Sequence, residues 1–154
     1  MDRDLLVGAG AGGGPHVRVL KGLTGAPIIE FFAFDAGFTG GARVAACDIN
    51  GDGVPDIVVA AGPGGGPNVR VFDGVSGAPL PGALGSFFAY APGFTGGVVV
   101  GCADVNGDGV PDIITGAGPG GGPHVRVFSG VDASVIFELM AFAPGLLNGA
   151  FVGP

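Results

Sequence analysis

The feature that most limits the fold of this 154-residue chain is an internal repeat of about 52 residues. A glycine-rich segment at 8–20 recurs at 60–72 and again at 116–128. The spacing is 52 residues from His16 to Asn68 and 56 from Asn68 to His124, so the second copy carries four inserted residues. A period of this length is typical of solenoids and propellers, in which each repeat buries its apolar faces against its neighbours.

Each repeat predicts four short antiparallel strands, called a to d. Runs rich in Val, Ile and Phe alternate with Gly, Pro and Asn, and no segment has helical periodicity. Strand b is apolar on both faces, as expected for a strand between neighbouring sheets. The expected ranges are 42–48 and 98–104 for a; 5–9, 57–61 and 113–117 for b; 17–20, 69–72 and 125–128 for c; and 28–34, 86–90 and 135–142 for d.

The predicted fold class is all-β, with the strands arranged as β-propeller blades. Four strands in about 50 residues is the sequence signature of one blade. A β-solenoid is the alternative, but the nine-residue Gly-Asp repeat of the calcium-binding roll is absent. The inserted residues fall within 80–85, where we expect a longer surface loop.

The strand order predicts one repeat domain, 1–154, that begins and ends within a blade. Blade 1 holds strands b to d at 1–36, blade 2 covers 37–92, blade 3 covers 93–144, and 145–154 is an orphan strand a. Three blades are too few to close a ring, because propellers have about four to eight. We therefore expect the orphan strand to complete a blade of a neighbouring chain, giving a six-bladed dimer or a head-to-tail fibre. The alternative is a fragment excised from a longer array.

Two nine-residue loops between strands a and b, at 48–56 and 104–112, carry the pattern Asp-Xaa-Asn-Gly-Asp-Gly-Val-Pro-Asp. Oxygen-bearing side chains at alternate positions suit Ca²⁺, and the glycines allow the positive φ angles that a tight cage needs. A pair of metal-free Asn-Gly and Asp-Gly turns is the alternative. The predicted ligands are Asp48, Asn50, Asp52, the backbone carbonyl of Val54, Asp56, Asp104, Asn106, Asp108, the backbone carbonyl of Val110, and Asp112.

The loop and the strand after it resemble the FG-GAP repeat of integrin-like β-propellers. The segment 112–119, Asp-Ile-Ile-Thr-Gly-Ala-Gly-Pro, carries the tail of that motif with one extra Gly before the Pro. The resemblance implies that the calcium loop joins the first two strands of a blade at one rim of the propeller. The Gly-Gly-Gly-Pro-His/Asn-Val-Arg-Val variant is similar to bacterial arrays of such repeats on secreted or surface proteins.

Composition excludes several classes of partner and activity. A net charge of −7 and a charged content of 12% leave no basic patch for nucleic acid or an anionic membrane. No apolar run is long enough to span a bilayer. The Gly-Xaa-Gly-Xaa-Xaa-Gly segments at 8–13 and 116–121 precede a strand instead of a helix, which excludes a dinucleotide site. No candidate catalytic constellation is found, so we expect the chain not to be an enzyme.

Two further sets of residues hold related places in the repeat. Arg18, Arg70 and Arg126 share one position of strand c, where we expect hydrogen bonds or ion pairs between blades.

Cys47 and Cys102 lie one residue out of register on neighbouring blades. Their thiols therefore face toward or away from each other, and we favour two buried free thiols over a disulfide.

Together these patterns predict a calcium-binding structural or adhesive propeller module that assembles with copies of itself. The expected cofactor is Ca²⁺, and the expected location is extracellular or on a cell surface, although the chain carries no signal peptide. The alternative is a lectin-like module that binds glycans, for which the exposed aromatic platforms are scarce.

Overall fold

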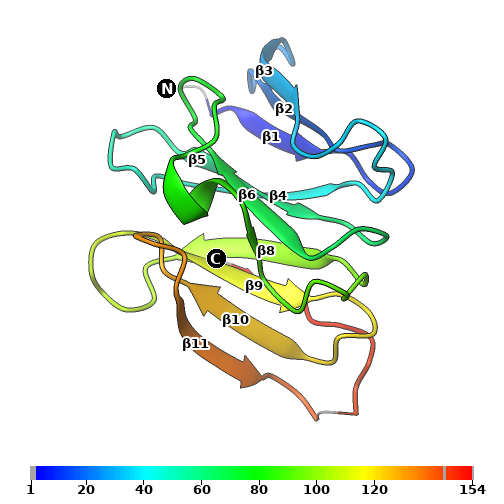
Figure 1. The fold of residues 1–154 in the computed structure, drawn as a ribbon. Helices are drawn as coiled ribbons and strands as arrows, with labels where there is room; N and C mark the ends of the chain where they lie inside the picture. The colour runs from blue at the N-terminus through cyan, green and yellow to red at the C-terminus, as the bar shows by residue number, and fades with distance from the viewer. Residues whose placement is uncertain (1–2, 144, 154) are drawn as a thin grey trace.

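Three antiparallel sheets lie one upon another in the structure, a computed structural model that describes residues 3–143 and 145–153 (Figure 1). Blade 1 contains β1 (Leu5–Gly8), β2 (His16–Leu20) and β3 (Pro27–Phe32). Blade 2 contains β4 (Ala42–Cys47), β5 (Asp56–Ala61), β6 (Asn68–Phe72) and β7 (Phe87–Phe88). Blade 3 contains β8 (Val98–Ala103), β9 (Asp112–Ala117), β10 (His124–Phe128) and β11 (Val135–Met140). The predicted all-β class is confirmed, and each sheet follows chain order as a propeller blade does.

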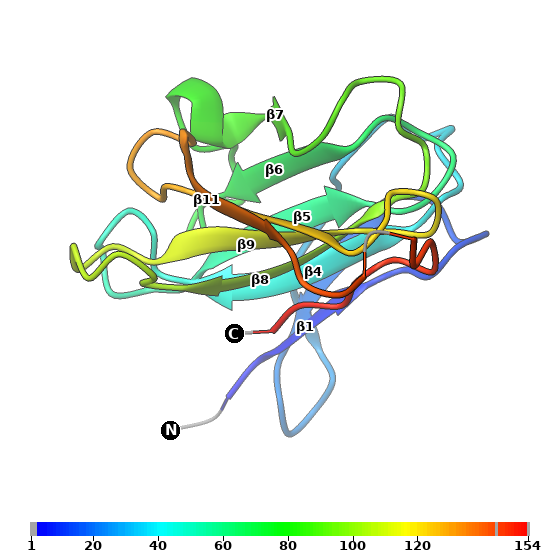
Figure 2. The same cartoon turned by 90° about the horizontal axis from the view of Figure 1, so that it is seen from below.

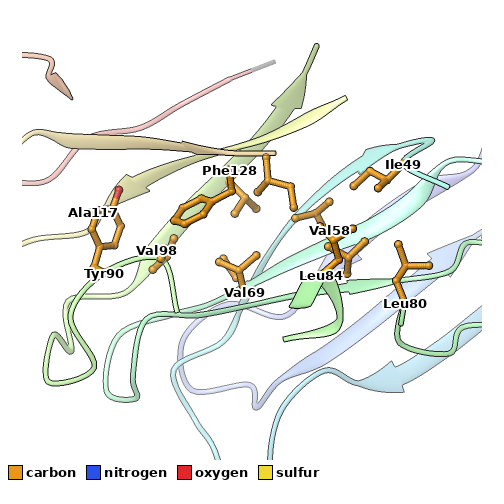
Figure 3. Close-up of a cluster of buried hydrophobic side chains, with 14 residues drawn as sticks. Ile49, Val58, Val69, Leu80, Leu84, Tyr90, Val98, Ala117 and Phe128 are labelled. Atoms are coloured by element: carbon orange, nitrogen blue, oxygen red, sulfur yellow. The ribbon is translucent and has the colours of Figure 1, made fainter. Parts of the chain in front are cut away.

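The core lies between the sheets because each blade buries an apolar face against the next. Between blades 2 and 3, Val58, Val69, Val98, Ile113 and Phe128 belong to one buried cluster, most of which Figure 3 labels. A second buried cluster joins blades 1 and 2. β5 lies in the middle sheet and is buried along its whole length, which matches the apolar pattern of strand b on both faces.

An aromatic pair repeats at both interfaces between blades. The rings of Phe31 and Phe72 have centroids 4.5 Å apart, and those of Phe87 and Phe128 have centroids 4.8 Å apart. In each pair, strand d of one blade supplies the first ring and strand c of the next blade supplies the second. The repeat in sequence is therefore also a repeat of the packing between blades.

The four-residue insertion lies at the surface at 81–83, as predicted, but two leucines within 80–85 anchor it to the core, which the prediction of a surface loop missed. It forms a short 3₁₀ helix, η1 (Gly82–Gly85). Leu80 and Leu84, at this insertion, are buried in the cluster between blades 2 and 3 (Figure 3). Their burial removes apolar surface from water, which a mobile loop would leave exposed. Among the described residues, no helix has the length and apolarity needed to cross a membrane.

The C-terminal segment is not the strand expected at 145–154, because residues 145–153 have no strand assignment and 154, like 1, 2 and 144, lies outside the described residues. The segment nevertheless follows the backbone course of a next inner strand, beside β8 and β9 in both views (Figures 1 and 2). The N–H of Ala150 donates to the carbonyl of Ala117 at 2.9 Å, as that of Ala42 at the start of β4 donates to Ala9 at 2.8 Å. A β-strand is defined by a hydrogen-bonded ladder with a neighbouring strand, and no described residue forms such a ladder with residues 145–153.

Cys47 and Cys102 form a disulfide between β4 and β8, so the expectation of two free thiols is wrong. Both residues are half-buried on inner strands that lie beside each other. The offset of one residue in register turns the two side chains toward each other, which was the alternative left open by the sequence.

Candidate functional site

The two loops between strands a and b have the same backbone course. One joins β4 to β5 and the other joins β8 to β9. Gly51 and Gly53 have φ angles of 78° and 87°, and Gly107 and Gly109 have φ angles of 76° and 89°. Residues with side chains rarely adopt these angles, so the glycines permit the tight turn that the sequence predicted.

The first Asp of each loop turns inward and closes the loop. Asp48 Oδ1 accepts hydrogen bonds from the N–H groups of Gly51 at 2.8 Å and Asp52 at 3.2 Å, and its Oδ2 accepts one from Gly53 at 2.8 Å. Asp104 makes the corresponding three bonds to its own loop at 2.8, 3.2 and 2.9 Å. These charge-assisted bonds hold the loop in a ring around the carboxylate.

The side-chain oxygens of the third and fifth positions also accept hydrogen bonds within the loop. Asn50 Oδ1 accepts from the N–H of Asp52 at 3.1 Å, and Asp52 Oδ1 accepts from the N–H of Val54 at 2.8 Å. In the second loop, Asn106 and Asp108 accept the equivalent bonds at 3.2 and 2.9 Å. The side-chain oxygens of positions 1, 3 and 5 therefore all accept hydrogen bonds from N–H groups of their own loop.

The last Asp of each loop is completely buried and anchors two connections at once. Asp56 Oδ2 accepts from the N–H groups of Ile49 at 2.8 Å and Asn50 at 3.0 Å, and its Oδ1 accepts from Gly74 at 3.1 Å. Asp112 does the same with Val105, Asn106 and Gly130. Sequence reasoning treated these residues as metal ligands only and missed this anchoring role. The glycines at 74 and 130, which recur at one place in the repeat, were the available signal.

Asp73 is a second residue that sequence reasoning missed. Its Oδ1 accepts a hydrogen bond from Asn50 Nδ2 at 3.5 Å, which connects the first loop to the turn after β6. The hydrogen bond from the Ser76 hydroxyl, with further bonds from the Val75 and Ser76 N–H groups, lowers the pKa of the Asp73 carboxyl. Asp73 is therefore kept as an anion beside the loop.

The oxygen donors of each loop match the chemistry that Ca²⁺ requires, since all are carboxylate, amide or carbonyl oxygens. Among the described residues, no group of three or more His, Cys, Asp or Glu side chains is placed to hold a metal. The third-position residues, Asn50 and Asn106, are asparagines and are not among these four residue types. The ligand set read from the sequence stays a prediction.

The strand c arginines join neighbouring blades. Arg70 Nη1 donates to the carbonyl of Ala33 at 3.0 Å, and Arg126 Nη1 donates to the carbonyl of Ala89 at 3.1 Å. The predicted hydrogen bonds between blades are confirmed for these two arginines. Arg18 instead pairs with Glu30 of its own blade, with Nε and Oε2 3.1 Å apart.

The sheets and loops define a chain of β-propeller-like blades with an oxygen-rich loop between the first two strands. Residues 40–79, which contain β4, the first loop, β5 and β6, match the family model of the FG-GAP repeat. This segment therefore carries an FG-GAP repeat, which confirms the FG-GAP resemblance seen in the sequence, while the similarity of the glycine-rich variant to bacterial arrays stays a prediction. Such repeats typically occur in extracellular or surface proteins. No curated protein matches the chain.

Proposed function

We propose that this adhesion-type module binds Ca²⁺ in its two loops and assembles with copies of itself by strand complementation. One observation carries the assembly. Residues 145–153 follow the course of an inner strand on blade 3, while the inner edge of β1, where strand a of blade 1 would pair, has no partner strand among the described residues. The FG-GAP match supports the adhesive class of module. The proposed role is structural and not enzymatic.

Calcium binding is supported by the oxygen-bearing side chains at alternate loop positions and by the positive φ angles of the loop glycines. Asp48, Asn50, Asp52, the Val54 carbonyl and Asp56 would hold one ion, and Asp104, Asn106, Asp108, the Val110 carbonyl and Asp112 would hold the other. A bound Ca²⁺ would offset the negative charge gathered in each loop. The two loops connect inner strands to β5 and β9, so binding would stabilise the centre of blades 2 and 3.

Thermal unfolding tests the calcium proposal. The chain is stripped with EDTA and Ca²⁺ is then added back, with Mg²⁺ as the comparison ion. Binding at 100 times Kd stabilises by about 2.7 kcal/mol per site, so we expect the melting temperature to rise by about 5–10 °C for one filled site. The double variant Asp48→Asn/Asp104→Asn should lose the Ca²⁺-dependent increment, and the exposed Asp35→Asn variant should keep it. A melting temperature that changes neither with EDTA nor with Ca²⁺ would contradict the proposal.

Assembly is supported by repeated backbone contacts at three places. The N–H of Gly120 donates to Leu147 at 2.7 Å, as that of Gly12 donates to Thr39 at 2.7 Å and that of Gly64 to Thr95 at 3.0 Å. The segment that precedes each inner strand thus lies in the same way on blades 1, 2 and 3. In the assembly, residues 150–153 of one copy would pair with the edge of β1 in the next.

Light scattering tests the assembly. We expect the purified chain to form a closed dimer or a longer head-to-tail series, and deletion of residues 148–154 to convert it to a monomer. The substitution Leu23→Ala, at a side chain that is 82% exposed in the turn between β2 and β3, is the matched control. An assembly size that the deletion leaves unchanged would exclude strand complementation. If instead the edges are covered by further repeats of a longer polypeptide, the chain alone will be monomeric.

The proposed location is extracellular or on a cell surface. The disulfide between Cys47 and Cys102 supports it, since disulfides persist mainly in oxidising compartments. Millimolar extracellular calcium would fill sites with a Kd of about 10⁻⁴–10⁻³ M.

A further inference from the structure

An arginine contact joins neighbouring blades within the chain. The arginine of this contact also occurs on the outer face of blade 1, and its acceptor on the outer face of blade 3, where no described blade faces either of them. The complete form is seen between blades 1 and 2. Arg70 Nη1 donates to the carbonyl of Ala33, and its Cζ lies 5.8 Å from the ring centroid of Phe34. The guanidinium thus binds a carbonyl and an aromatic face from the end of strand d of the preceding blade.

The same contact recurs between blades 2 and 3. Arg126 Nη1 donates to the carbonyl of Ala89, and its Cζ lies 5.7 Å from the ring centroid of Tyr90. Arg126 Nε lies 3.1 Å from Glu138 Oε2 of its own blade. One guanidinium therefore pairs with a carboxylate within its blade while it reaches across to the blade before.

Arg18 is the arginine half of this contact without its partner. It faces Val7 across the β1–β2 ladder, as Arg70 faces Val59 and Arg126 faces Thr115. Its Nε lies 3.1 Å from Glu30 Oε2, the same pairing that Arg126 makes with Glu138. The Arg18 side chain is 50% exposed, against 30% for Arg126. The ion pair holds Arg18 in place while the rest of its guanidinium stays accessible.

Ala141 and Phe142 are the acceptor half. The N–H of Ala141 donates to Pro123 at 2.8 Å, as the N–H groups of Ala33 and Ala89 donate to Pro15 and Pro67, each at 2.9 Å. These bonds hold the three alanines in equivalent backbone positions. Phe142 is 61% exposed whereas Tyr90, its equivalent, is only 8% exposed, because blade 3 covers Tyr90 and no described blade covers Phe142.

We propose that Arg18 of one copy binds the Ala141 carbonyl and the Phe142 ring of a second copy of this chain. The proposal rests on the proposed assembly and names the side chains that recognise the partner. A second copy is the occupant because the contact continues an interface that the chain already forms twice, with both halves in the required places.

Apolar surface on the same two faces supports this occupant. Leu5 and Val7 are exposed, although their equivalents Ile57 and Val59 are buried against blade 1. On the other face Leu139 is exposed, although its equivalent Phe87 packs on Phe128. Joining the two faces would bury all three side chains, so the arginine contact would form at the rim of an apolar interface.

Self-association of single and mixed variants tests the contact. Arg18→Ala removes the charge-assisted hydrogen bond and the cation–π contact together and should weaken association at least about tenfold. Phe142→Ala removes the ring but leaves the Ala141 carbonyl in place, so it should weaken association by a smaller factor. Sedimentation velocity gives the affinities. Lys21→Ala and Phe88→Ala, at exposed positions away from the proposed interface, are the matched controls and should associate as the unaltered chain does. Circular dichroism checks that every variant is folded.

Mixing the two variants gives the decisive readout. An Arg18→Ala chain still offers Phe142, and a Phe142→Ala chain still offers Arg18, so a mixed pair keeps one intact contact where each variant paired with itself keeps none. One labelled copy of each should therefore pair more tightly than either variant pairs with itself. Mixed pairs that form no better than either variant alone, or variants that associate as tightly as the unaltered chain, would overturn the contact while leaving the assembly standing. An unaltered chain that stays monomeric would overturn the assembly itself.

Discussion

Cys47 in β4 is bonded to Cys102 in β8, and their Cα atoms lie 6.5 Å apart. The two cysteines are 55 residues apart in sequence, so the bond closes a long loop that contains the first oxygen-rich loop and most of blade 2. It ties the inner strand of blade 2 to that of blade 3. In the chain-entropy account, a crosslink of this span restricts the unfolded chain more strongly than the folded one.

Reduction of this disulfide should destabilise the chain. A closed loop of this length corresponds to a stabilisation of about 4 kcal/mol in the chain-entropy account, and measured values are typically ~2–4 kcal/mol. We expect the urea midpoint to fall in the presence of dithiothreitol. The double variant Cys47→Ala/Cys102→Ala should unfold at the lower midpoint, and dithiothreitol should not change that midpoint. Equal midpoints for oxidised and reduced chains, with the redox state verified by mass, would contradict the expectation.

The buried carboxylate of Asp112 should be essential for stability without any metal. It accepts three backbone N–H bonds, from Val105, Asn106 and Gly130. Asp112→Asn presents an NH₂ group to some of these donors, so we expect a loss of about 3 kcal/mol in the free energy of unfolding. The measurement is urea unfolding in EDTA. The control Asp132→Asn changes an exposed carboxylate and should leave the urea midpoint close to that of the unaltered chain. Equal stabilities for the two variants would refute the anchoring role.

The sequence predicted the fold well because its repeat, strand lengths and turn residues all agree. Strand a of blades 2 and 3 and every strand b and c begin and end within one residue of the expected positions, but 145–153 forms no strand, and β7 has only two residues where 86–90 were expected. The apolar run continues through Tyr90, whereas the ladder with β6 ends at Phe88 and the chain bends at Ala89 and Tyr90, which bond to blade 3. Packing between blades decides that bend, and a pattern within one strand does not report it. The burial of Leu80 and Leu84 escaped prediction for the same reason.

The tight turn of the candidate site was predicted, whereas its metal ligands stay a prediction. The glycines at 51 and 53 indicated that Asp48, Asn50 and Asp52 share one tight loop. Spacing did not indicate that Asp56 would bond to Gly74, since that contact joins segments 18 residues apart. The disulfide was not predicted for a related reason. Register alone left two orientations of Cys47 and Cys102, and the packing of β4 beside β8 selects one of them.

A side chain at Gly8 should disturb the contact between blades 1 and 2. A Cβ atom there would meet the carbonyl oxygen of Ala42 at the start of β4. Backbone cannot move away as a flexible side chain can, so Gly8→Ala should lower the free energy of unfolding by about 1–3 kcal/mol. Gly10→Ala is a close control, because a Cβ atom at Gly10 meets nothing within 4 Å. Urea unfolding of both variants is the measurement, and equal stabilities would exclude the close approach.

Tyr90 reports on the interface between blades 2 and 3, and it is the single tyrosine of the chain. Its hydroxyl donates to the carbonyl of His124 at 2.8 Å and lies 3.2 Å from Thr115 Oγ1. Burial raises the pKa of Tyr90 to about 12, although the Thr115 hydroxyl and the Arg126 charge oppose the shift. An ultraviolet titration should therefore show tyrosinate forming near pH 12 in the folded chain and near the ordinary value of about 10 in urea.

The sign of the linked stability follows from this difference. The folded state holds the phenol proton more tightly than the unfolded state, so this contribution to stability is complete below about pH 10 and is lost as the pH rises toward about 12. Tyr90→Phe removes the titrating group, and the loss of stability between these two pH values should be smaller in the variant than in the unaltered chain. A tyrosine that titrates at the same pH in the folded and urea-unfolded chain would show that blade 3 does not cover Tyr90 in solution.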